Sequence, residues 1–135
     1  MAYGNQSIDQ YRKAAVSTAS PLQLVIMLYD GALRFMQQGK AAMASGDLQE
    51  HNDKLQKAQK IIAELTSCLD MDQGGEIAQN LFALYDFAYN RLVTANVEDR
   101  PDCIDQAMKV LSELRESWVQ VEGQQRAEEI QRHAA

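Results

Sequence analysis

The sequence has few of the residues on which catalysis, metal binding and nucleic-acid binding depend. Its 135 residues include two histidines, two cysteines, two prolines and one tryptophan. Lysine and arginine total 13 against 19 acidic residues, and no basic cluster occurs, so the composition argues against a nucleic-acid partner. Cys68 and Cys103 lack metal-ligand spacing, and two cysteines in this length indicate reduced thiols of an intracellular protein rather than a disulfide framework.

Signals for secretion and for crossing a membrane are also missing. The first ten residues are polar, which does not fit a signal peptide. The longest apolar run is far shorter than the roughly 20 residues of a membrane-spanning helix. The chain length predicts one domain that can bury a sizeable core. We therefore expect a cytoplasmic protein without membrane insertion.

Catalytic groups do not gather in any recognisable pattern. His51 falls on a helix seam and His133 in a polar end of the chain, so neither is placed as a base beside a nucleophile. Asp30 and Asp86 each follow a tyrosine, and we expect them to accept hydrogen bonds or to pair with arginines of their own helices. The sequence predicts no enzyme, no cofactor and no metal site.

The stretch from Ser20 to Phe35 is the most informative one that is present. Ser20, Pro21 and Gln23 form an S-P-x-Q start, in which serine caps the helix, proline suits its first position and glutamine completes a capping box. The next two turns are apolar all round, which is typical of a helix buried on most sides. Two interpretations remain open: a central helix of a compact bundle, or a helix that also lines a groove for a partner.

Three further helices follow, joined by short connections. Leu48, Leu55, Ile62 and Leu69 repeat every seven residues and predict a bundle seam. Short connections make neighbouring helices antiparallel, and no strand pattern competes. We therefore expect an all-α protein, an antiparallel four-helix bundle with a short N-terminal cap helix. The expected helices span residues 21–44, 48–69, 76–96 and 101–122, with Asn96 ending the third and Gly74-Gly75 forming a tight turn before it.

The two ends of the chain differ from the bundle at residues 20–122. Residues 1–19 form a polar tail in which Ile8 and Tyr11 fall on one face of a short amphipathic cap segment. A segment this short is marginal as an isolated helix, so we expect it to dock on the bundle as a displaceable lid. Residues 123–135 are polar, and we expect them to fray.

The expected first and third helices have more apolar surface than a bundle seam needs. A stripe of Phe82, Tyr85 and Tyr89 accompanies the core stripe of the third helix. We interpret the surplus as a groove for a partner segment, with adaptable methionine at its surface. The predicted partner-binding residues of the groove and lid are Ile8, Tyr11, Leu24, Met27, Leu28, Tyr29, Phe82, Tyr85 and Tyr89.

Several of these stretches resemble the FliS family, the bacterial flagellar export chaperones for flagellin. The similarity covers residues 11–118 in family order, and the pieces S-P-x-x-L and G-G-E-I-A-x-N-L are specific. The matching pieces are T-A-S-P at 18–21, M-L-Y-D-G-A at 27–32, K-A-Q-K-I-I-A-E-L at 57–65, L-D-M-D-Q-G-G-E-I-A-Q-N-L-F-A-L-Y-D-F at 69–87, R-L-V-T-A-N at 91–96 and L-S-E-L-R-E-S-W at 111–118.

The resemblance implies an antiparallel four-helix bundle with an N-terminal cap and a function without turnover. It implies a cytoplasmic chaperone that binds the disordered C-terminal segment of flagellin and prevents premature polymerisation. It also implies delivery to the flagellar type III export apparatus, where the membrane protein FlhA receives the loaded complex. The alternative from the residues alone is a non-catalytic helical adaptor or a homodimeric scaffold, which uses the same apolar faces on a second copy.

Overall fold

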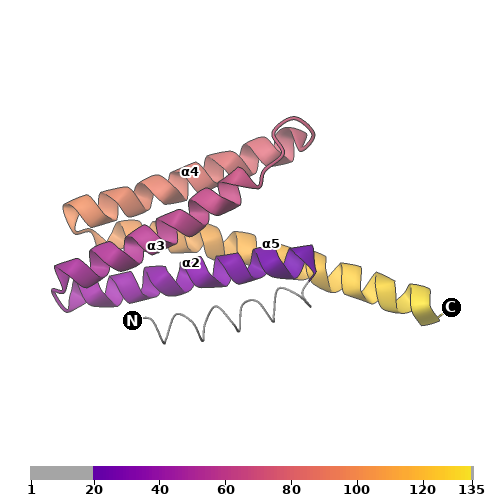
Figure 1. The fold of residues 1–135 in the computed structure, drawn as a ribbon, viewed down its shortest axis with the longest axis horizontal. Helices are drawn as coiled ribbons and strands as arrows, with labels where there is room; N and C mark the ends of the chain where they lie inside the picture. Colours follow the sequence, from indigo (N-terminus) through magenta and orange to yellow (C-terminus); the bar gives the residue numbers. More distant parts are fainter. Residues whose placement is uncertain (1–19, 135) are drawn as a thin grey trace.

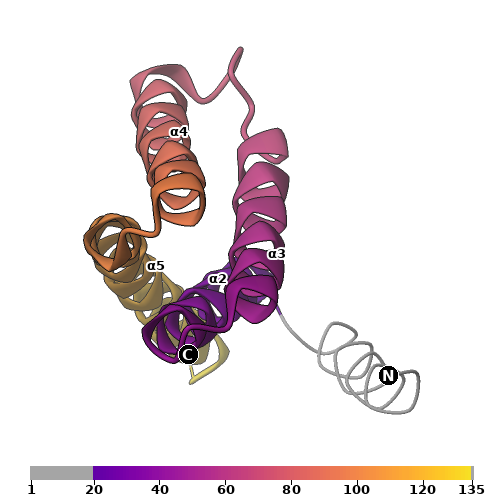
Figure 2. The same cartoon turned by 90° about the vertical axis from the view of Figure 1, so that its left-hand side faces the viewer.

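The computed structural model describes residues 20–134, and these form four α-helices. They are α2 (Pro21–Ala44), α3 (Leu48–Ser67), α4 (Gly75–Glu98) and α5 (Pro101–Ala134). Successive helices run in opposite directions, and each contacts the next, with α5 returning to α2 (Figures 1 and 2). The predicted antiparallel four-helix bundle is confirmed. The expected cap helix lies outside the described residues.

The predicted starts of α2 and α3 agree with the structure because each has a side-chain cap. The Ser20 hydroxyl accepts from the Gln23 N–H at 3.2 Å, and the Gln23 side chain accepts from the Ser20 N–H at 2.9 Å. Asp47 caps α3 by accepting from the Glu50 N–H at 3.1 Å. The capping box and the aspartate cap therefore satisfy backbone donors that have no partner within their own helices.

The predicted helix ends were less accurate. Helix α4 does not end at Asn96; it ends at Glu98, and Asp99 adopts the left-handed conformation with φ 56°. Helix α5 does not stop at residue 122 and fray, but continues to Ala134. Its last turns are rich in strong helix formers and contain an i, i+4 pair between Glu122 and Arg126, which extends a helix already nucleated in the bundle.

Helices α2 and α3 approach each other closely through glycine. A Cβ at Gly31 would stand 3.3 Å from Ile61 Cδ1, and one at Gly39 only 2.8 Å from Leu55 Cδ2. Both glycines are buried, so each allows a close approach of the two helices. The α3–α4 connection is the predicted tight turn, because a Cβ at Gly74 would stand 2.5 Å from the Asp70 backbone oxygen.

The core fills the space enclosed by the four helices. Its largest fully buried side chains come from every helix, and they are Tyr29, Met36, Leu55, Ile62, Leu92, Ile104 and Leu111. Over the described range, no helix is both long enough and apolar enough to cross a membrane. The exposed apolar side chains that do not belong to this core identify the surfaces available for binding.

Candidate functional site

Helix α4 has apolar side chains on its outer surface as well as on its core side. Phe82, Tyr89, Val93 and Val97 share one side of the helix and are 37% to 79% exposed; we call them the α4 outer stripe. From first to last they extend about 22 Å along the helix axis. Isolated exposed apolar residues are common, but an aligned set of this length is typical of a binding surface.

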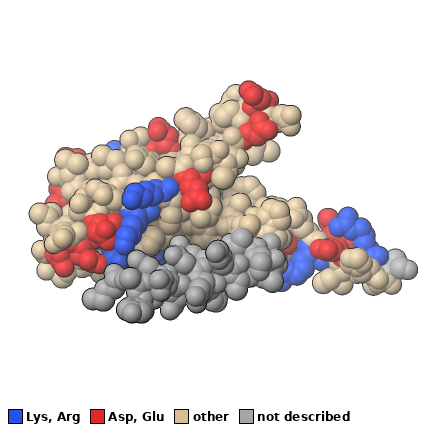
Figure 3. Space-filling model, in the orientation of Figure 1, with Lys and Arg blue, Asp and Glu red and all other residues tan. Residues whose placement is uncertain are grey.

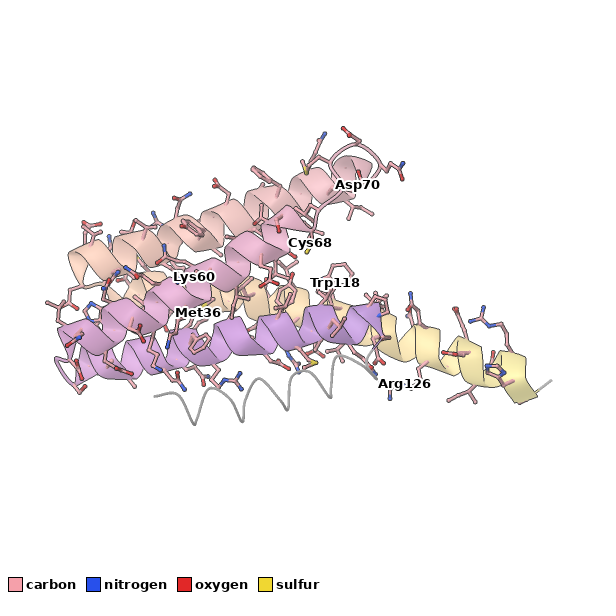
Figure 4. The ribbon with its side chains drawn as sticks, viewed as in Figure 1. Met36, Lys60, Cys68, Asp70, Trp118 and Arg126 are labelled. Carbon is pink, nitrogen blue, oxygen red and sulfur yellow. The ribbon has the colours of Figure 1, made fainter. Side chains whose placement is uncertain are left out.

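A shallow groove of about 370 Å³ lies beside the α4 outer stripe, between α3 and α4. The amide groups near it are held in place, because Asn52 Oδ1 accepts from Asn96 Nδ2 at 2.6 Å and from Gln56 Nε2 at 3.2 Å. Lys60 lies on α3 and supplies the one charge of the lining (Figure 4). The groove is lined by Gln56, Gln59, Lys60 and Ala63 of α3 and by Tyr89, Val93, Asn96 and Val97 of α4.

The opposite flank of α4 has a second, smaller set of exposed apolar side chains, namely Ile77, Leu84 and Phe87. The Arg91 guanidinium lies 5.8 Å from the Phe87 ring centre, and its Nη1 is 4.0 Å from the Cys103 Sγ of α5. This flank therefore faces the α5 side of the bundle, whereas the α4 outer stripe faces α3.

A buried polar network joins α2, α4 and α5. Trp118 Nε1 donates to the Tyr29 hydroxyl at 3.1 Å, and the hydroxyl oxygens of Tyr29 and Tyr85 are 2.6 Å apart. Burial raises the pKa of the Tyr29 hydroxyl. The pKa of the Tyr85 hydroxyl is raised mainly by burial and, to a smaller extent, by the hydrogen bond with Tyr29. Both phenols therefore remain protonated at neutral pH and act as neutral hydrogen-bonding groups.

Several of the charged groups within residues 20–134 form ion pairs. Asp30 accepts a hydrogen bond from Arg115 of α5, which confirms the first predicted alternative, whereas the predicted pairing with an arginine of its own helix is wrong. His51 is buried, and its Nε2 has no hydrogen-bond partner among the described residues. No three histidine, cysteine, aspartate or glutamate side chains in the described range are placed to hold a metal ion.

The predicted aromatic site residues divide into two pairs. Phe82 and Tyr89 are exposed on the α4 outer stripe. Tyr29 and Tyr85 are at most 2% exposed, so the structure places them in the core rather than on a groove wall. Since Tyr85 is one turn from both exposed aromatics, the apolar pattern alone did not distinguish the side of α4 that faces inward. We leave Tyr29 and Tyr85 out of the contact surface.

The remaining predicted site residues belong to α2 and to the N-terminal tail. Leu24, Met27 and Leu28 are half-buried on the first turns of α2, away from the groove between α3 and α4. Ile8 and Tyr11 lie outside the described residues. The structure therefore brings Tyr89 into the groove and leaves the α2 residues as a separate surface.

Of the residues that line the groove, only Tyr89 was in the predicted site; the others, Val93, Asn96 and Val97 of α4 and Gln56, Gln59, Lys60 and Ala63 of α3, were missing from it. The i, i+4, i+8 spacing of Tyr89, Val93 and Val97 is visible in the sequence and could have identified Val97. Nothing comparable marks the four α3 residues, because they line the groove only through the packing of α3 against α4.

Comparison with known proteins gives one consistent result. Residues 4–125 match the family model described as "Flagellar protein FliS". The flagellar secretion chaperone FliS of Vibrio cholerae serotype O1 is 40% identical over 119 residues, which are 85% of this chain and 88% of that protein. The chaperone of the same name from Salmonella typhimurium is 37% identical over 121 residues, 89% of this chain and 87% of that protein.

A likeness to a solved structure agrees with the observed fold. The chain superposes on a protein described as "flagellar chaperone from bacteria" with a TM-score of 0.73, covering 90% of this chain and 98% of the other. The sequence identity is 22%, so this likeness supports the helical architecture alone.

Proposed function

Because the chain belongs to the FliS family of flagellar secretion chaperones, we propose that its client is the disordered C-terminal segment of flagellin. In this proposal the chain keeps flagellin from polymerising in the cytosol. It then delivers the client to the flagellar type III export apparatus, where FlhA receives the loaded complex. The protein acts by binding, without turnover and without a cofactor.

The apolar outer surface of α4 is the observation that carries this proposal. A segment that folds on binding buries about 1,000–3,000 Å² and loses several kcal/mol to ordering, so its receptor needs long apolar surfaces rather than a small pocket. The α4 outer stripe and the adjoining groove offer such a surface. Within residues 20–134, no three histidine, cysteine, aspartate or glutamate side chains are placed to hold a metal ion.

The shape of the groove favours a helical client. Tyr89, Val93 and Val97 form a row at successive turns of α4, which suits an amphipathic helix docking through anchors at i, i+4 and i+8. The amides of Gln56 and Asn96 border this row, so uncharged polar side chains of the client suit its edge. Lys60 is placed to meet one acidic client residue.

The N-terminal part of α2 is the second surface in the proposal. Leu24, Met27 and Leu28 remain half-buried there. We assign Ile8 and Tyr11 to a lid that covers client-binding surface in the free protein and is displaced when the client binds.

Titration with a peptide of the flagellin C-terminal segment tests the proposed function. The peptide should bind, and circular dichroism of the mixture should exceed the sum of the parts in helical signal, because the client orders on the groove. Val93→Asp should weaken binding at least about tenfold, about 1.4 kcal/mol, since it places a charge in the apolar row.

Ile130→Asp is the matched control, because Ile130 is 63% exposed on the part of α5 beyond the bundle. It should bind the peptide as the parent protein does. If the parent protein binds no peptide but forms a dimer that Val93→Asp dissociates, the homodimeric scaffold is correct and the chaperone proposal is wrong.

A further inference from the structure

One acidic residue interrupts the apolar row of the α4 outer stripe. Asp86 lies four residues after Phe82 and three before Tyr89, so helix geometry places it on the same side of α4. It is exposed, and its side chain makes no hydrogen bond or ion pair in the described part of the chain. The predicted arginine partner is absent, because Arg91 lies over the Phe87 ring on the opposite flank. Aspartate is a poor residue for the middle of a helix, so helix stability does not explain Asp86.

The α3 edge of the groove contains a lysine that has no ion pair within residues 20–134. The space-filling view shows basic side chains gathered over the middle of α3 (blue in Figure 3). Two of the three lysines of α3, Lys54 and Lys57, each form an ion pair with an acidic residue one turn earlier, at 3.5 and 3.2 Å. For Lys60 that place is taken by Gln56, which has no charge. The Lys60 ammonium group therefore remains available at the α3 edge of the groove.

The two charges stand at nearly the same height along the groove. Asn96 Nδ2 donates to Asn52 Oδ1 at 2.6 Å, so these two residues are level in the antiparallel pair of α3 and α4. Eight residues further along α3 is Lys60, and eight residues back along α4 is Ala88. Asp86 is two residues from Ala88, which is about 3 Å along the helix axis. Lys60 on the α3 edge and Asp86 on the α4 edge therefore flank the same turn of a helix bound between them.

Opposite charges on the two edges make the groove sensitive to the direction of a bound helix. An amphipathic helix in the groove turns one edge toward α3 and the other toward α4. When the helix is turned end for end with its apolar side still facing the groove, these two edges exchange places. An acidic side chain facing Lys60 and a basic one facing Asp86 are therefore favoured in one direction, and the reverse direction brings like charges together. Exposed ion pairs add little affinity, but like charges across an interface are strongly unfavourable, so the effect is mainly discrimination.

We propose that Lys60 and Asp86 determine the direction in which the client helix binds. An acidic side chain on one edge of the client helix meets Lys60, and a lysine or arginine on its other edge, at the same turn, meets Asp86. The apolar side chains between these edges pack on Tyr89 and Val93. This inference rests on the proposed function, because the client helix is that of the bound flagellin segment.

Exchanging the two charges tests the proposal without altering the net charge of the protein. The double variant Lys60→Glu/Asp86→Lys should bind a peptide of the flagellin C-terminal segment at least about tenfold more weakly at low salt, because both contacts become repulsive. The matched control Lys109→Glu/Glu113→Lys exchanges two exposed charges on α5 and should bind the peptide as the parent protein does. Calorimetry measures the affinities, and circular dichroism shows that both variants remain folded.

A peptide in which acidic and basic residues are exchanged provides the reciprocal test. The Lys60→Glu/Asp86→Lys variant should bind this exchanged peptide more tightly than the parent protein does, whereas the parent protein should prefer the original peptide. The preferences of the two proteins should differ by at least about tenfold, and the difference should decrease at high salt, because salt screens exposed charges.

Asp86→Asn separates recognition of a client cation from simple repulsion of other surfaces. If Asp86 meets a lysine or arginine of the client, removing its charge should weaken peptide binding by about two- to fivefold. Unchanged or tighter binding by the folded variant would show that Asp86 only opposes contacts of the apolar stripe, and it would overturn the inference.

The results distinguish failure of this inference from failure of the proposed function. Peptide binding that the exchange of Lys60 and Asp86 does not weaken overturns the inference and leaves the chaperone proposal standing. An equal loss of affinity in the folded α5 control overturns it in the same way, because the effect would then not belong to the groove. Absence of any peptide binding by the parent protein overturns both proposals.

Discussion

At the residue scale, the glycines of the helices have opposite roles that the sequence does not distinguish. Gly39 allows Leu55 to pack directly against the backbone of α2, whereas nothing lies within 4 Å of a Cβ placed at Gly123. The first glycine therefore contributes to the α2–α3 interface, and the second only weakens its own helix. Substituting alanine at each site separates the two effects.

Gly39→Ala should destabilise the bundle by about 1–3 kcal/mol, because the new methyl group would stand 2.8 Å from the Leu55 Cδ2. Gly123→Ala should leave global stability unchanged or raise it by up to about 1 kcal/mol, since alanine is the better helix former. Urea unfolding of both variants measures the difference. Equal midpoints would show that Leu55 relaxes without cost and that the interface does not require glycine.

Trp118 and Tyr89 should differ in whether their loss affects stability or client binding. Trp118→Ala should cost about 2–3 kcal/mol, less than the roughly 3–5 kcal/mol of a fully buried tryptophan, because Trp118 is half-buried. Tyr89→Ala should cost less stability but weaken client binding, because Tyr89 is 37% exposed and lines the groove. Unfolding and peptide titration of each variant give the two rankings, and a reversed order would contradict the assignment of the two sites.

Residue-level burial was only partly predictable from the sequence. Tyr85 and Tyr89 are equally apolar and lie one turn apart, so periodicity placed both on one stripe. The structure separates them because the Tyr85 hydroxyl finds Tyr29 within the core. That partner comes from a different helix, and its proximity follows from how the helices pack, which no local pattern specifies.

At the element scale, the clearest difference from expectation is the length of α5. Glu122 connects this helix to the start of α2, since Gln23 Nε2 donates to Glu122 Oε1 at 3.1 Å. Arg126 donates to both carboxylate oxygens of Glu122 at 2.6 and 2.5 Å. The helix beyond the bundle is therefore anchored at its base, where the sequence shows only polar residues without a core stripe.

This anchor should make the end of α5 sensitive to acid. The hydrogen bonds from Arg126 lower the pKa of Glu122 most. The positive charge of Arg126 and the hydrogen bond from Gln23 lower it further. A carboxyl group whose pKa is lowered by folding stabilises the structure above its unfolded pKa of about 4.3, and the stabilisation is lost as pH falls through the lowered value. Residues 123–134 should therefore fray in acid before the bundle unfolds.

Hydrogen exchange of the amides in residues 123–134, followed from neutral pH into acid, measures this fraying. Glu122→Gln is the control, because it removes the titrating group and should show fast exchange at every pH. Protection that does not change with pH in the parent protein would show that the ion pair does not hold the helix.

Helix starts were predicted more accurately than helix ends, although the end of α2 at Ala44 was predicted correctly, and the difference has a physical reason. Starts at Ser20 and Asp47 are set by side chains that bond to backbone a few residues away. Ends depend on competing local conformations, as at Asp99, where the left-handed cap lies three residues beyond the predicted asparagine. The bundle itself followed from helix periodicity and short connections, because these are the two properties that determine it.

At the scale of the whole molecule, the proposed client surface lies on the outside of the bundle. The four helices bury one core, and α4 alone of them has aligned apolar side chains on both flanks. Client binding should therefore leave the bundle intact. The client should also compete with the predicted lid for these surfaces.

Deleting residues 1–16 tests the predicted lid. The bundle should remain folded, more apolar dye should bind, and client affinity should stay the same or increase, because a short segment of this kind is displaced easily. Circular dichroism, dye fluorescence and peptide titration give the three results. An affinity loss greater than about tenfold in the folded variant would mean that Ile8 or Tyr11 contacts the client directly.

Valine methyl NMR tests most directly whether α4 is the client surface. Val93 and Val97 lie in the groove, whereas Val110 lies on α5 and serves as an internal reference. On saturation with the flagellin C-terminal peptide, the methyl signals of Val93 and Val97 should shift while those of Val110 stay in place. Saturated binding with unchanged Val93 and Val97 signals would contradict the assignment of the client to this surface.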